Sequence, residues 1–368
     1  MEPRKKKIAF VIGGLTPGGA ERVITNLSNS LSKDFDVVII TFIESDPFYT
    51  LNDSVKVISC FKKLPKPSSF IGSLKLNYVI LKQVSKITKR EKIDLLIGFI
   101  TQANIKAVIA AKLNRIPCLI SERNDPLKND IPKFWVILRK FIYPRADCLI
   151  VQTEKVKQVY ERMIKTKDMV VLPNPISSEL SQLRKAYSTN REKIILSVGT
   201  FNNDKRQEKI ISAFHELNLS NWQLLLIGEG PTESKLKAMV QDLNLSNKVQ
   251  FLSKIRNVEY YYNKASIFAF SSKAEGFPNV LLEAMHFGLP SISTDCNYGP
   301  SELIDDGENG FLVPVDDQTM FVEKLGHLVS NEDLQMSFSI KSKETTEKFL
   351  DTHVTSSWKS LILDHLAK

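Results

Sequence analysis

Lys7-Ile-Ala-Phe-Val-Ile-Gly13 and Lys193-Ile-Ile-Leu-Ser-Val-Gly199 are the two stretches that decide the fold of this chain. Each is an apolar run that ends in glycine and is followed by a polar loop and a helical pattern. A short apolar run of this kind is typical of a β-strand buried on both faces of a parallel sheet. Because this beginning occurs twice, we predict two doubly wound α/β domains and not one large sheet.

Apolar strands alternate with helical patterns along the rest of the chain, as expected for parallel α/β domains. The predicted strands of the first half are Ile8–Ile12, Val37–Phe42, Val55–Ile58, Leu95–Ile100, Cys118–Ser121, Cys148–Val151 and Val170–Leu172. Those of the second half are Ile194–Val198, Gln223–Ile227, Val249–Phe251, Ile267–Ala269 and Ser291–Thr294. The predicted helices of the first half are Ala20–Leu31, Ser73–Lys89, Ile105–Leu113, Lys133–Ile142 and Glu154–Arg162.

The domain boundaries follow from the polar stretch Asn174–Arg191, which Pro173 and Pro175 open and which we interpret as a linker. We predict a first Rossmann-like domain over residues 1–175 and a second over residues 176–351. Residues 352–368 form a predicted helix that packs back on the first domain. Doubly wound sheets bind ligands beyond the carboxyl ends of their strands, so we expect the two domains to face a ligand cleft.

Composition is that of a soluble protein with two ordinary cores: 368 residues, 43% hydrophobic and 25% charged. No apolar run approaches the ~18 residues that a membrane span needs. The basic start at Arg4-Lys-Lys-Lys7 leads into the first predicted strand, without the cleavage region of a signal peptide. The four cysteines lack metal or redox spacing and are expected to be free thiols, mostly buried. We therefore expect a cytoplasmic enzyme.

Charge is divided unevenly between the two halves. Residues 1–175 contain 30 Lys and Arg against 16 Asp and Glu, whereas residues 176–368 contain 20 against 25. A basic half beside a mildly acidic half suggests that the first half contacts an extended anionic surface, either nucleic acid or an acidic membrane.

The most specific motif is Glu275-Gly-Phe-Pro-Asn-Val-Leu-Leu-Glu283. Pro278 and Asn279 suit the start of a helix, which places Glu275 in the preceding loop and Glu283 about one turn inside the helix. The backbone N–H groups of Phe277 to Val280 would then favour a diphosphate or sugar hydroxyls at the helix N-terminus. A capping glutamate followed by a solvent-facing one is the alternative for a Glu-x7-Glu spacing by itself.

This motif, with Gly288-Leu-Pro290 after it, resembles the corresponding segment of family-4 retaining glycosyltransferases, which have the glycosyltransferase-B fold. The resemblance covers essentially the whole chain. It includes Gly18-Gly19-Ala-Glu-Arg22 as the N-terminal glycine loop, Gly199 with Lys205 as the phosphate segment, and Gly228-Glu-Gly230-Pro231 after a strand. The stretch Asp295–Glu302 is similar to bacterial enzymes that extend undecaprenyl-diphosphate-linked glycans.

The resemblance implies roles for individual residues. Glu283 would bind the donor's ribose, and Glu275 the donor sugar near its reacting centre. Lys205, with Arg206, would neutralise the leaving diphosphate, because departure builds negative charge that a positioned cation stabilises. The remaining donor-binding residues would be Gly18, Gly19, Gly199, Thr200, Gly228, Gly230, Arg256, Phe277, Pro278, Asn279 and Val280.

The sequence departs from the family pattern at two positions. Thr200 stands where the family often has Arg, so either Arg206 substitutes or backbone amides hold the leaving diphosphate. Ser121-Glu-Arg-Asn124 contains Arg123 where the family often has His. A guanidinium stays charged and is no general base at neutral pH. Arg123 and Asn124 are therefore predicted to bind the acceptor, and a structural ion pair is the alternative for Arg123.

The resemblance implies sugar transfer with retention by same-face attack, and no second carboxylate is obviously placed as a nucleophile. Asp305-Asp306 and Asp316-Asp317 lie in loop-like stretches without the spacing of a metal site. We expect a metal-independent enzyme that uses a UDP-sugar as donor and requires no cofactor.

A basic, aromatic-containing region of the first domain suggests the membrane as a partner. Residues 62–92 contain nine Lys and Arg against the single acid Glu91, and Lys133–Tyr143 adds a second basic helix with aromatic residues. Such helices can lie on anionic lipid, although a solvated lysine face on a core helix is the alternative. No nucleic-acid module is present, so we expect a peripheral protein on the inner face of the cell membrane that extends a polyprenyl-diphosphate-linked glycan.

Two other functions remain compatible with these motifs. A UDP-sugar epimerase of the same architecture would act without an acceptor. A nucleotide-sugar-binding subunit without catalysis is suggested by Thr200 and Arg123.

Overall fold

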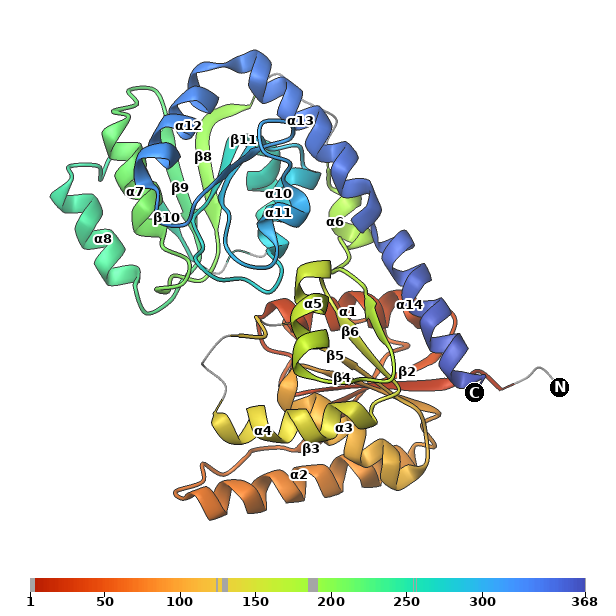
Figure 1. Cartoon of the computed structure of the whole chain (residues 1–368). Coiled ribbons are helices and arrows are strands. Elements are labelled where there is room, and N and C mark those ends of the chain that lie inside the picture. The colour runs from red at the N-terminus through yellow and green to blue at the C-terminus, as the bar shows by residue number, and fades with distance from the viewer. Residues whose placement is uncertain are drawn as a thin grey trace. The chain divides into compact units, whose positions relative to one another are not determined.

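The computed structural model describes residues 4–123, 125–127, 132–184, 191–253, 255 and 257–367. The chain divides into two compact units (Figure 1). Unit 1 contains the residues up to Pro175 together with those from Asp351 onward, and unit 2 is Ile176–Leu350. The chain therefore passes from one unit to the other twice.

Unit 1 contains a seven-stranded sheet in the order β3-β2-β1-β4-β5-β6-β7, and every neighbouring pair is parallel. The strands are β1 (Lys7–Ile12), β2 (Asp36–Ile43), β3 (Lys56–Phe61), β4 (Leu95–Phe99), β5 (Cys118–Ser121), β6 (Cys148–Val151) and β7 (Met169–Val171). The central strands are apolar at almost every position because helices cover both of their faces.

The helices of unit 1 fill the connections between its strands and include one from the far end of the chain (Figure 1). They are α1 (Gly19–Leu31), α2 (Phe70–Arg90), α3 (Thr101–Asn114), α4 (Lys133–Ile142), α5 (Glu154–Met163), α14 (Asp351–Leu366) and the short 3₁₀ helix Tyr143–Arg145. Val354, Trp358 and Ile362 of α14 recur at helical spacing and lie fully within the core with β1 and β4.

Unit 2 contains a six-stranded parallel sheet in the order β10-β9-β8-β11-β12-β13. The strands are β8 (Glu192–Val198), β9 (Gln223–Ile227), β10 (Val249–Leu252), β11 (Ala265–Phe270), β12 (Ser291–Thr294) and β13 (Phe311–Val313). The helices are α6 (Ser178–Gln182), α7 (Gln207–Glu216), α8 (Glu233–Asp242), α9 (Val258–Lys264), α10 (Asn279–His286), α11 (Pro300–Leu303), α12 (Gln318–Ser330), α13 (Glu332–Thr346) and the 3₁₀ helix Glu347–Phe349. Side chains of α7, α8 and α12 form one core cluster with the sheet, and those of α9 and α10 form another (Figure 1).

The predicted fold class is confirmed, since two separate parallel sheets with covering helices are present. The prediction was wrong in two details. The proposed linker Asn174–Arg191 contains helix α6, which Ser177 caps by accepting a hydrogen bond from the N–H of Leu180 at 3.1 Å. Leu180 packs in the core of unit 2, so this part of the stretch belongs to that unit. Strand β13 was not predicted.

Within the described ranges, no helix combines the length and the apolar character that crossing a membrane requires.

Candidate active site

The candidate site of unit 2 begins at the carboxyl ends of β8, β9 and β11, which meet at one edge of the sheet. The strand order reverses between β8 and β11, because β9 and β10 lie on one side of β8 while β11 and the later strands lie on the other. Doubly wound sheets bind ligands at this kind of switch point. The loops 199–206, 228–232 and 271–278 leave the sheet there.

Three glycines allow two of these loops to pack backbone against backbone. Gly199, Gly228 and Gly230 have φ of 156°, 154° and 156°, a region that other residues rarely adopt. A Cβ on Gly228 would collide with the carbonyl oxygen of Gly199, and one on Gly230 with that of Phe201. The N–H of Phe201 donates to the carbonyl of Glu229 at 2.9 Å, which closes the contact. These glycines therefore shape the loops from which Lys205 projects.

Lys205 and Glu275 form an ion pair, although 70 residues separate them in sequence. Ser272 Oγ also donates to Glu275 Oε1 at 2.6 Å, and Lys205 Nζ lies 5.4 Å from the centre of the Phe270 ring. The side chains keep 22% and 11% of their surface exposed, so both groups are largely desolvated but accessible. A cation and a carboxylate held in this way can contact different parts of one polar ligand.

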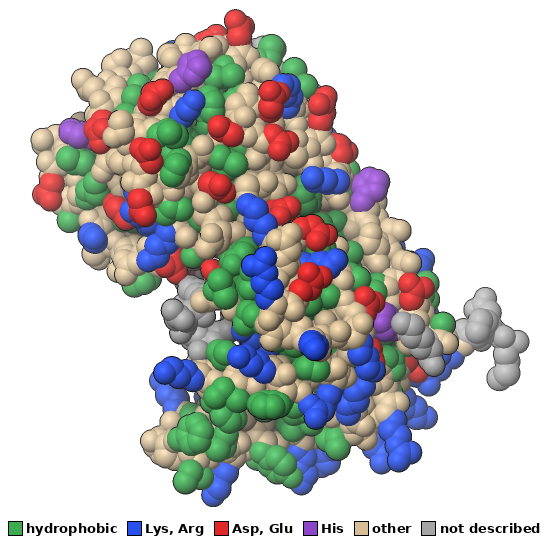
Figure 2. All heavy atoms as spheres, viewed as in Figure 1, with side chains coloured by type: hydrophobic (Ala, Val, Ile, Leu, Met, Phe, Trp, Pro, Cys, Tyr) green, Lys and Arg blue, Asp and Glu red, His purple; other side chains and the backbone are tan. Residues whose placement is uncertain are grey.

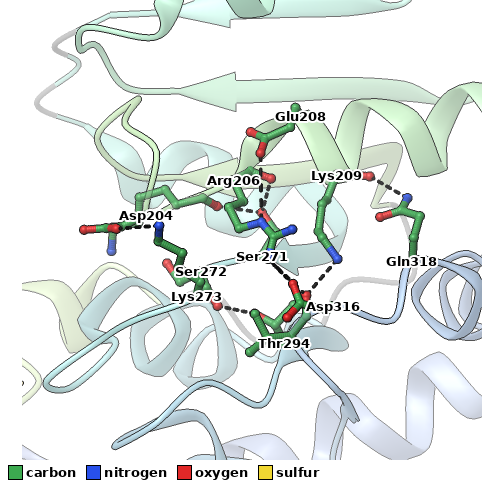
Figure 3. Close-up of polar contacts among 12 residues, drawn as sticks. Asp204, Arg206, Glu208, Lys209, Ser271, Ser272, Lys273, Thr294, Asp316 and Gln318 are labelled. Carbon is green, nitrogen blue, oxygen red and sulfur yellow. Dashed lines mark hydrogen bonds and ion pairs between the residues drawn. The ribbon is translucent and has the colours of Figure 1, made fainter.

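Backbone turns fix the direction of Lys205. Asn202 Oδ1 accepts hydrogen bonds from the N–H groups of Asp204 and Lys205, both at 3.0 Å. Ser271 Oγ donates to the carbonyls of Lys205 and Arg206 at 2.7 and 2.9 Å, which fastens loop 199–206 to the end of β11. Figure 3 shows this polar network, in which Thr294 reaches the backbone of Ser272 and Lys273 reaches Asp204.

Glu283 lies inside α10, where the motif predicted it, and is 5% exposed. Tyr262 of α9 donates its hydroxyl hydrogen to Glu283 Oε2 at 3.2 Å. A buried carboxylate with a directed donor is held in one orientation, which suits recognition of a hydroxyl pair on a ligand.

Arg206 was predicted to help Lys205 neutralise the leaving diphosphate, and in the structure its side chain contacts a different loop. Its guanidinium Nη1 donates to Asp316 Oδ1 at 2.7 Å and lies 3.4 Å from the carbonyl of Val315 (Figure 3). The backbone of Arg206 adopts φ 52°, a left-handed conformation that ends the loop before α7. Arg206 therefore binds the loop after β13, and in this arrangement its guanidinium is paired with Asp316.

The helix start at residues 277–280 also differs in part from the prediction. The ring of Phe277 lies in the core of unit 2, 5.8 Å from that of Phe349. The N–H of Asn279 donates to the carbonyl of Phe277 at 3.1 Å. Pro278 is buried against Gly299, and Val280 packs on the core. These residues shape the wall of the site more than they present donors to it.

Thr200, at the position where the sequence leaves the family pattern, is exposed. Its carbonyl accepts a hydrogen bond from Gln207 Nε2 at 3.1 Å. Because residue 200 carries no charge and Arg206 pairs with Asp316, Lys205 is the positive side chain that this loop places beside Glu275. Arg256 and Asn124 were also predicted as site residues and lie outside the described residues.

The glycine loop predicted in unit 1 lies at the start of α1. Gly18 is the residue before the helix, and the carboxylate of Glu21 folds over it so closely that a Cβ at Gly18 would collide. Burial raises the pKa of Glu21. Gly18 and Gly19 thus form a narrow turn without side chains.

Arg123 of unit 1 was predicted to bind the acceptor. Its side chain is buried, with 7% of the residue exposed, and its guanidinium binds groups within unit 1. Acceptor binding by Arg123 stays a prediction, and its contacts within unit 1 were not foreseen because the neighbours that enclose Arg123 come from distant parts of the chain.

Ser272 and Tyr262 contact the two glutamates and were not predicted. Ser271 and Ser272 directly follow the buried strand β11, and polar residues at the carboxyl end of a parallel strand are a signal that sequence reasoning could have used. Tyr262 has no such signal, because its contact with α10 depends on tertiary packing.

Cys296 lies near the Lys205–Glu275 pair and remains a thiol. Burial, together with the nearby charge of Glu275, raises its pKa to about 12. It is therefore no nucleophile at neutral pH. Among the described residues, no group of three or more His, Cys, Asp or Glu side chains is arranged to hold a metal ion.

A second surface of interest lies on helices α2 and α4 of unit 1. Their rings Phe70 and Phe134 are 5.9 Å apart. The exposed apolar residues around this contact, called the α2/α4 apolar face, are Phe70, Ile71, Leu74, Tyr78, Val79, Phe134, Ile137 and Phe141. Figure 2 shows apolar side chains gathered on the part of unit 1 that carries these helices, with Lys and Arg beside them.

The two halves of α2 differ. Leu74 and Tyr78 in the first half are exposed, whereas Val84 and Ile87 in the second half are buried. The lysines of residues 62–92 are all exposed. An apolar face with a basic border is unusual for surface in contact with water alone.

Two family models match the chain. "Glycosyltransferase Family 4" matches residues 17–180, and "Glycosyl transferases group 1" matches residues 181–345. Each model thus covers most of one unit.

Relatives with assigned activities match over nearly the full length. A Campylobacter jejuni protein named GalNAc-α-(1→4)-GalNAc-α-(1→3)-diNAcBac-PP-undecaprenol α-1,4-N-acetyl-D-galactosaminyltransferase is 32% identical over 365 residues, covering 97% of this chain and 98% of that protein. A second protein of that organism, N-acetylgalactosamine-N,N'-diacetylbacillosaminyl-diphospho-undecaprenol 4-α-N-acetylgalactosaminyltransferase, is 29% identical and covers 94% of this chain and 96% of its own.

Solved structures share the fold. Anabaena HepE in complex with UDP and glucose has a TM-score of 0.79 at 16% identity, covering 98% of this chain and 100% of its own. The pneumococcal O-GlcNAc transferase GtfA in complex with UDP and GlcNAc has a TM-score of 0.81 at 14% identity and covers both chains completely.

Proposed function

This chain belongs to the family-4, group-1 glycosyltransferases, and from that membership we propose that it moves an N-acetylhexosamine or a hexose from a UDP-sugar to an undecaprenyl-diphosphate-linked saccharide with retention of configuration. Such a reaction extends a lipid-linked glycan for the bacterial surface. The relative from Campylobacter jejuni named as acting on an undecaprenol-linked glycan supports this choice of acceptor.

The ion pair between Lys205 and Glu275 is the observation that supports the chemistry best. A leaving UDP develops negative charge, and a positioned cation in a partly desolvated site stabilises it. Lys205 fits that role. Glu275 accepts hydrogen bonds from the donor sugar near its reacting carbon, and Glu283, oriented by Tyr262, accepts those of the ribose hydroxyls.

Retention follows from attack of the acceptor hydroxyl on the face from which UDP leaves. In this proposal the departing phosphate takes the hydroxyl proton, and no covalent glycosyl-enzyme forms. The thiol of Cys296, held protonated by its raised pKa, stays outside the reaction. The reaction is proposed to run without a metal ion.

The α2/α4 apolar face is proposed to bring unit 1 to an anionic membrane surface. Aromatic and aliphatic side chains bury in the headgroup region while neighbouring lysines pair with acidic lipids, each at about 1 kcal/mol. The enzyme would then act as a peripheral protein on the cytoplasmic face, where its lipid-linked acceptor is present.

A donor screen that monitors UDP release tests the reaction. Each common UDP-sugar and GDP-mannose is supplied with an undecaprenyl-diphosphate-linked acceptor, with and without a chelator. We expect one UDP-sugar to be consumed only when the acceptor is present, at equal rates in both buffers. Conversion of a UDP-sugar without acceptor would favour an epimerase, and donor binding without turnover on any acceptor would favour a non-catalytic subunit.

Substitutions test the site. We expect Lys205→Ala, Glu275→Ala and Glu283→Ala each to lower kcat/KM by about 10²- to 10³-fold, as loss of a charge-stabilising group does. Lys237→Ala is the matched control, since Lys237 pairs with Glu233 at 2.7 Å on α8 of the same unit. Full activity in Glu275→Ala and Glu283→Ala would remove both residues from the mechanism.

A further inference from the structure

The chain passes between its units through two segments. The outgoing segment is residues 172–176, which follows β7, and the returning segment is residues 349–351, which leads into α14. Within unit 2 the two segments pair, because Ile176 forms a parallel bridge with Leu350 and its N–H donates to the carbonyl of Phe349 at 2.8 Å. Within unit 1, Arg123, which follows β5, contacts the outgoing segment and also Trp358 of α14, the helix into which the returning segment leads.

The guanidinium of Arg123 binds the outgoing segment by hydrogen bonds. Nη1 donates to Asn174 Oδ1 at 2.7 Å and to the carbonyl of Leu172 at 3.2 Å. Nε donates to Ser121 Oγ at 2.7 Å, which fixes the guanidinium to the end of β5. One planar group therefore links a central strand to the last residues before the chain leaves unit 1.

The same guanidinium lies against the helix that follows the returning segment. Its carbon is 5.6 Å from the ring centre of Trp358 in α14 and 5.2 Å from that of Phe99 in β4. The two rings stack on one another at 5.9 Å with 19° between their planes. Near the start of α14, Ser30 Oγ donates to Asp351 Oδ2 at 2.6 Å, which holds the helix start to α1.

This arrangement requires arginine. Burying a guanidinium costs free energy, and apolar residues of similar volume often give equal or greater stability. Burial of Arg123 is reflected in a pKa lowered to about 9. Lysine would provide the charge but not the planar fork that reaches Ser121, Leu172 and Asn174 while stacking on Trp358. Arginine at position 123 therefore contributes a fixed geometry more than it contributes stability.

We propose that Arg123 is a positioning residue that clasps the outgoing segment to helix α14 within unit 1, so that the outgoing segment and the helix that continues the returning segment move together when the enzyme transfers sugar. The inference uses the transfer reaction of the family and does not depend on which donor or acceptor the enzyme accepts. It assigns to Arg123 a function other than binding substrate.

Hydrogen exchange of the full-length protein, measured by mass spectrometry, tests the clasp without substrate. We expect Arg123→Lys and Asn174→Ala to speed exchange in peptides that cover residues 172–176 and 349–352. Asn174→Asp keeps an acceptor oxygen toward Arg123 and should restore exchange close to that of the wild type. Because no substrate is present, this result stands apart from the proposed donor and acceptor.

Arg139→Lys is the matched control. Arg139 is also a buried arginine of unit 1, with 2% of the residue exposed, and it donates to Tyr160 Oη at 3.1 Å, away from both segments. We expect Arg139→Lys and Arg123→Lys both to lower Tm, but only Arg123→Lys to change exchange in the two segments.

Kinetics provide the second measurement. A mutation that misplaces reacting groups by about 1 Å can lower the rate by about 10²-fold, even when it lies far from the chemistry. We therefore expect Arg123→Lys to lower the kcat of the folded protein by about 10- to 100-fold. The donor KM should stay nearly unchanged. A merely structural arginine would lower Tm and leave both the exchange of the two segments and kcat as in the control. That outcome would overturn the proposal.

Discussion

At the scale of the residue, the site is defined by which charges are already paired. Lys205 is held by Glu275 at the sheet edge, whereas its neighbour Arg206 is held by Asp316 on another loop. Adjacent cations in the sequence thus serve different tasks. The backbone of Arg206 is left-handed, with φ 52°, and its guanidinium reaches Asp316.

Arg206→Gly should therefore be tolerated. Glycine adopts φ 52° without strain, which offsets part of the lost Asp316 contact, and an exposed ion pair contributes only about 0–1 kcal/mol. We expect kcat within about threefold of the wild type, since less than 1 kcal/mol of transition-state stabilisation is at stake. Steady-state kinetics measure this, with Lys205→Ala as the damaging comparison. A loss in Arg206→Gly as large as that in Lys205→Ala would mean that Arg206 turns to the leaving diphosphate during the reaction.

At the scale of the element, helices are held to the two sheets by different means. Helix α10, which contains Glu283, is held by apolar packing and by contacts of its buried His286. Helix α4 buries Trp135 and Arg139 and exposes Phe134, Ile137 and Phe141, so its apolar face points away from the core. Trp135 stacks on the buried ammonium of Lys106 at 4.7 Å. Trp135 and Arg139 thus anchor α4 to unit 1, and its exposed apolar side chains are free to contact lipid.

Binding of the α2/α4 apolar face to membranes should depend on both charge and apolar contact. We expect wild-type protein to float with vesicles that contain acidic lipid, and to dissociate as salt screens the lysines over a Debye length of about 10 Å at 0.1 M. Substituting Phe70 and Phe134 with Ser should weaken binding at every salt concentration. A control with Leu113→Ser removes an equally exposed apolar residue of α3 outside this face. Binding that ignores lipid charge and salt would leave only a solvated lysine face.

The buried His286 of α10 should make stability depend on pH. Burial, with Arg184 nearby, lowers its pKa to about 4, so the folded protein keeps the imidazole neutral. Between pH 6.5 and about 4 the unfolded chain binds the proton more readily, and stability should fall by about 3 kcal/mol as pH decreases through this window. Urea unfolding at pH 7 and pH 4.5 measures the change. His286→Gln should flatten the dependence, while substitution of the exposed His215 should not; an unchanged slope in His286→Gln would contradict the argument.

At the scale of the whole molecule, the sequence predicted what local patterns determine. Repeated strand–glycine starts and alternating apolar runs predicted two parallel sheets, and most strand limits agree within one or two residues. The motif Glu275–Glu283 placed one glutamate in a loop and one in a helix, as found. The directions of Arg206 and Arg123 were not predictable, because Asp316 and Trp358 approach them from distant parts of the chain.

The return of the chain to unit 1 has a consequence for synthesis. Val354, Trp358 and Ile362 complete the core of the unit whose strands are translated first, whereas unit 2 is a single continuous segment. On the ribosome, unit 2 can close as soon as it emerges, but unit 1 must wait with a hydrophobic groove open until α14 is released. Nascent chains with exposed apolar surface are prone to aggregate and are bound by chaperones. The domain that is made first is thus the domain that is finished last.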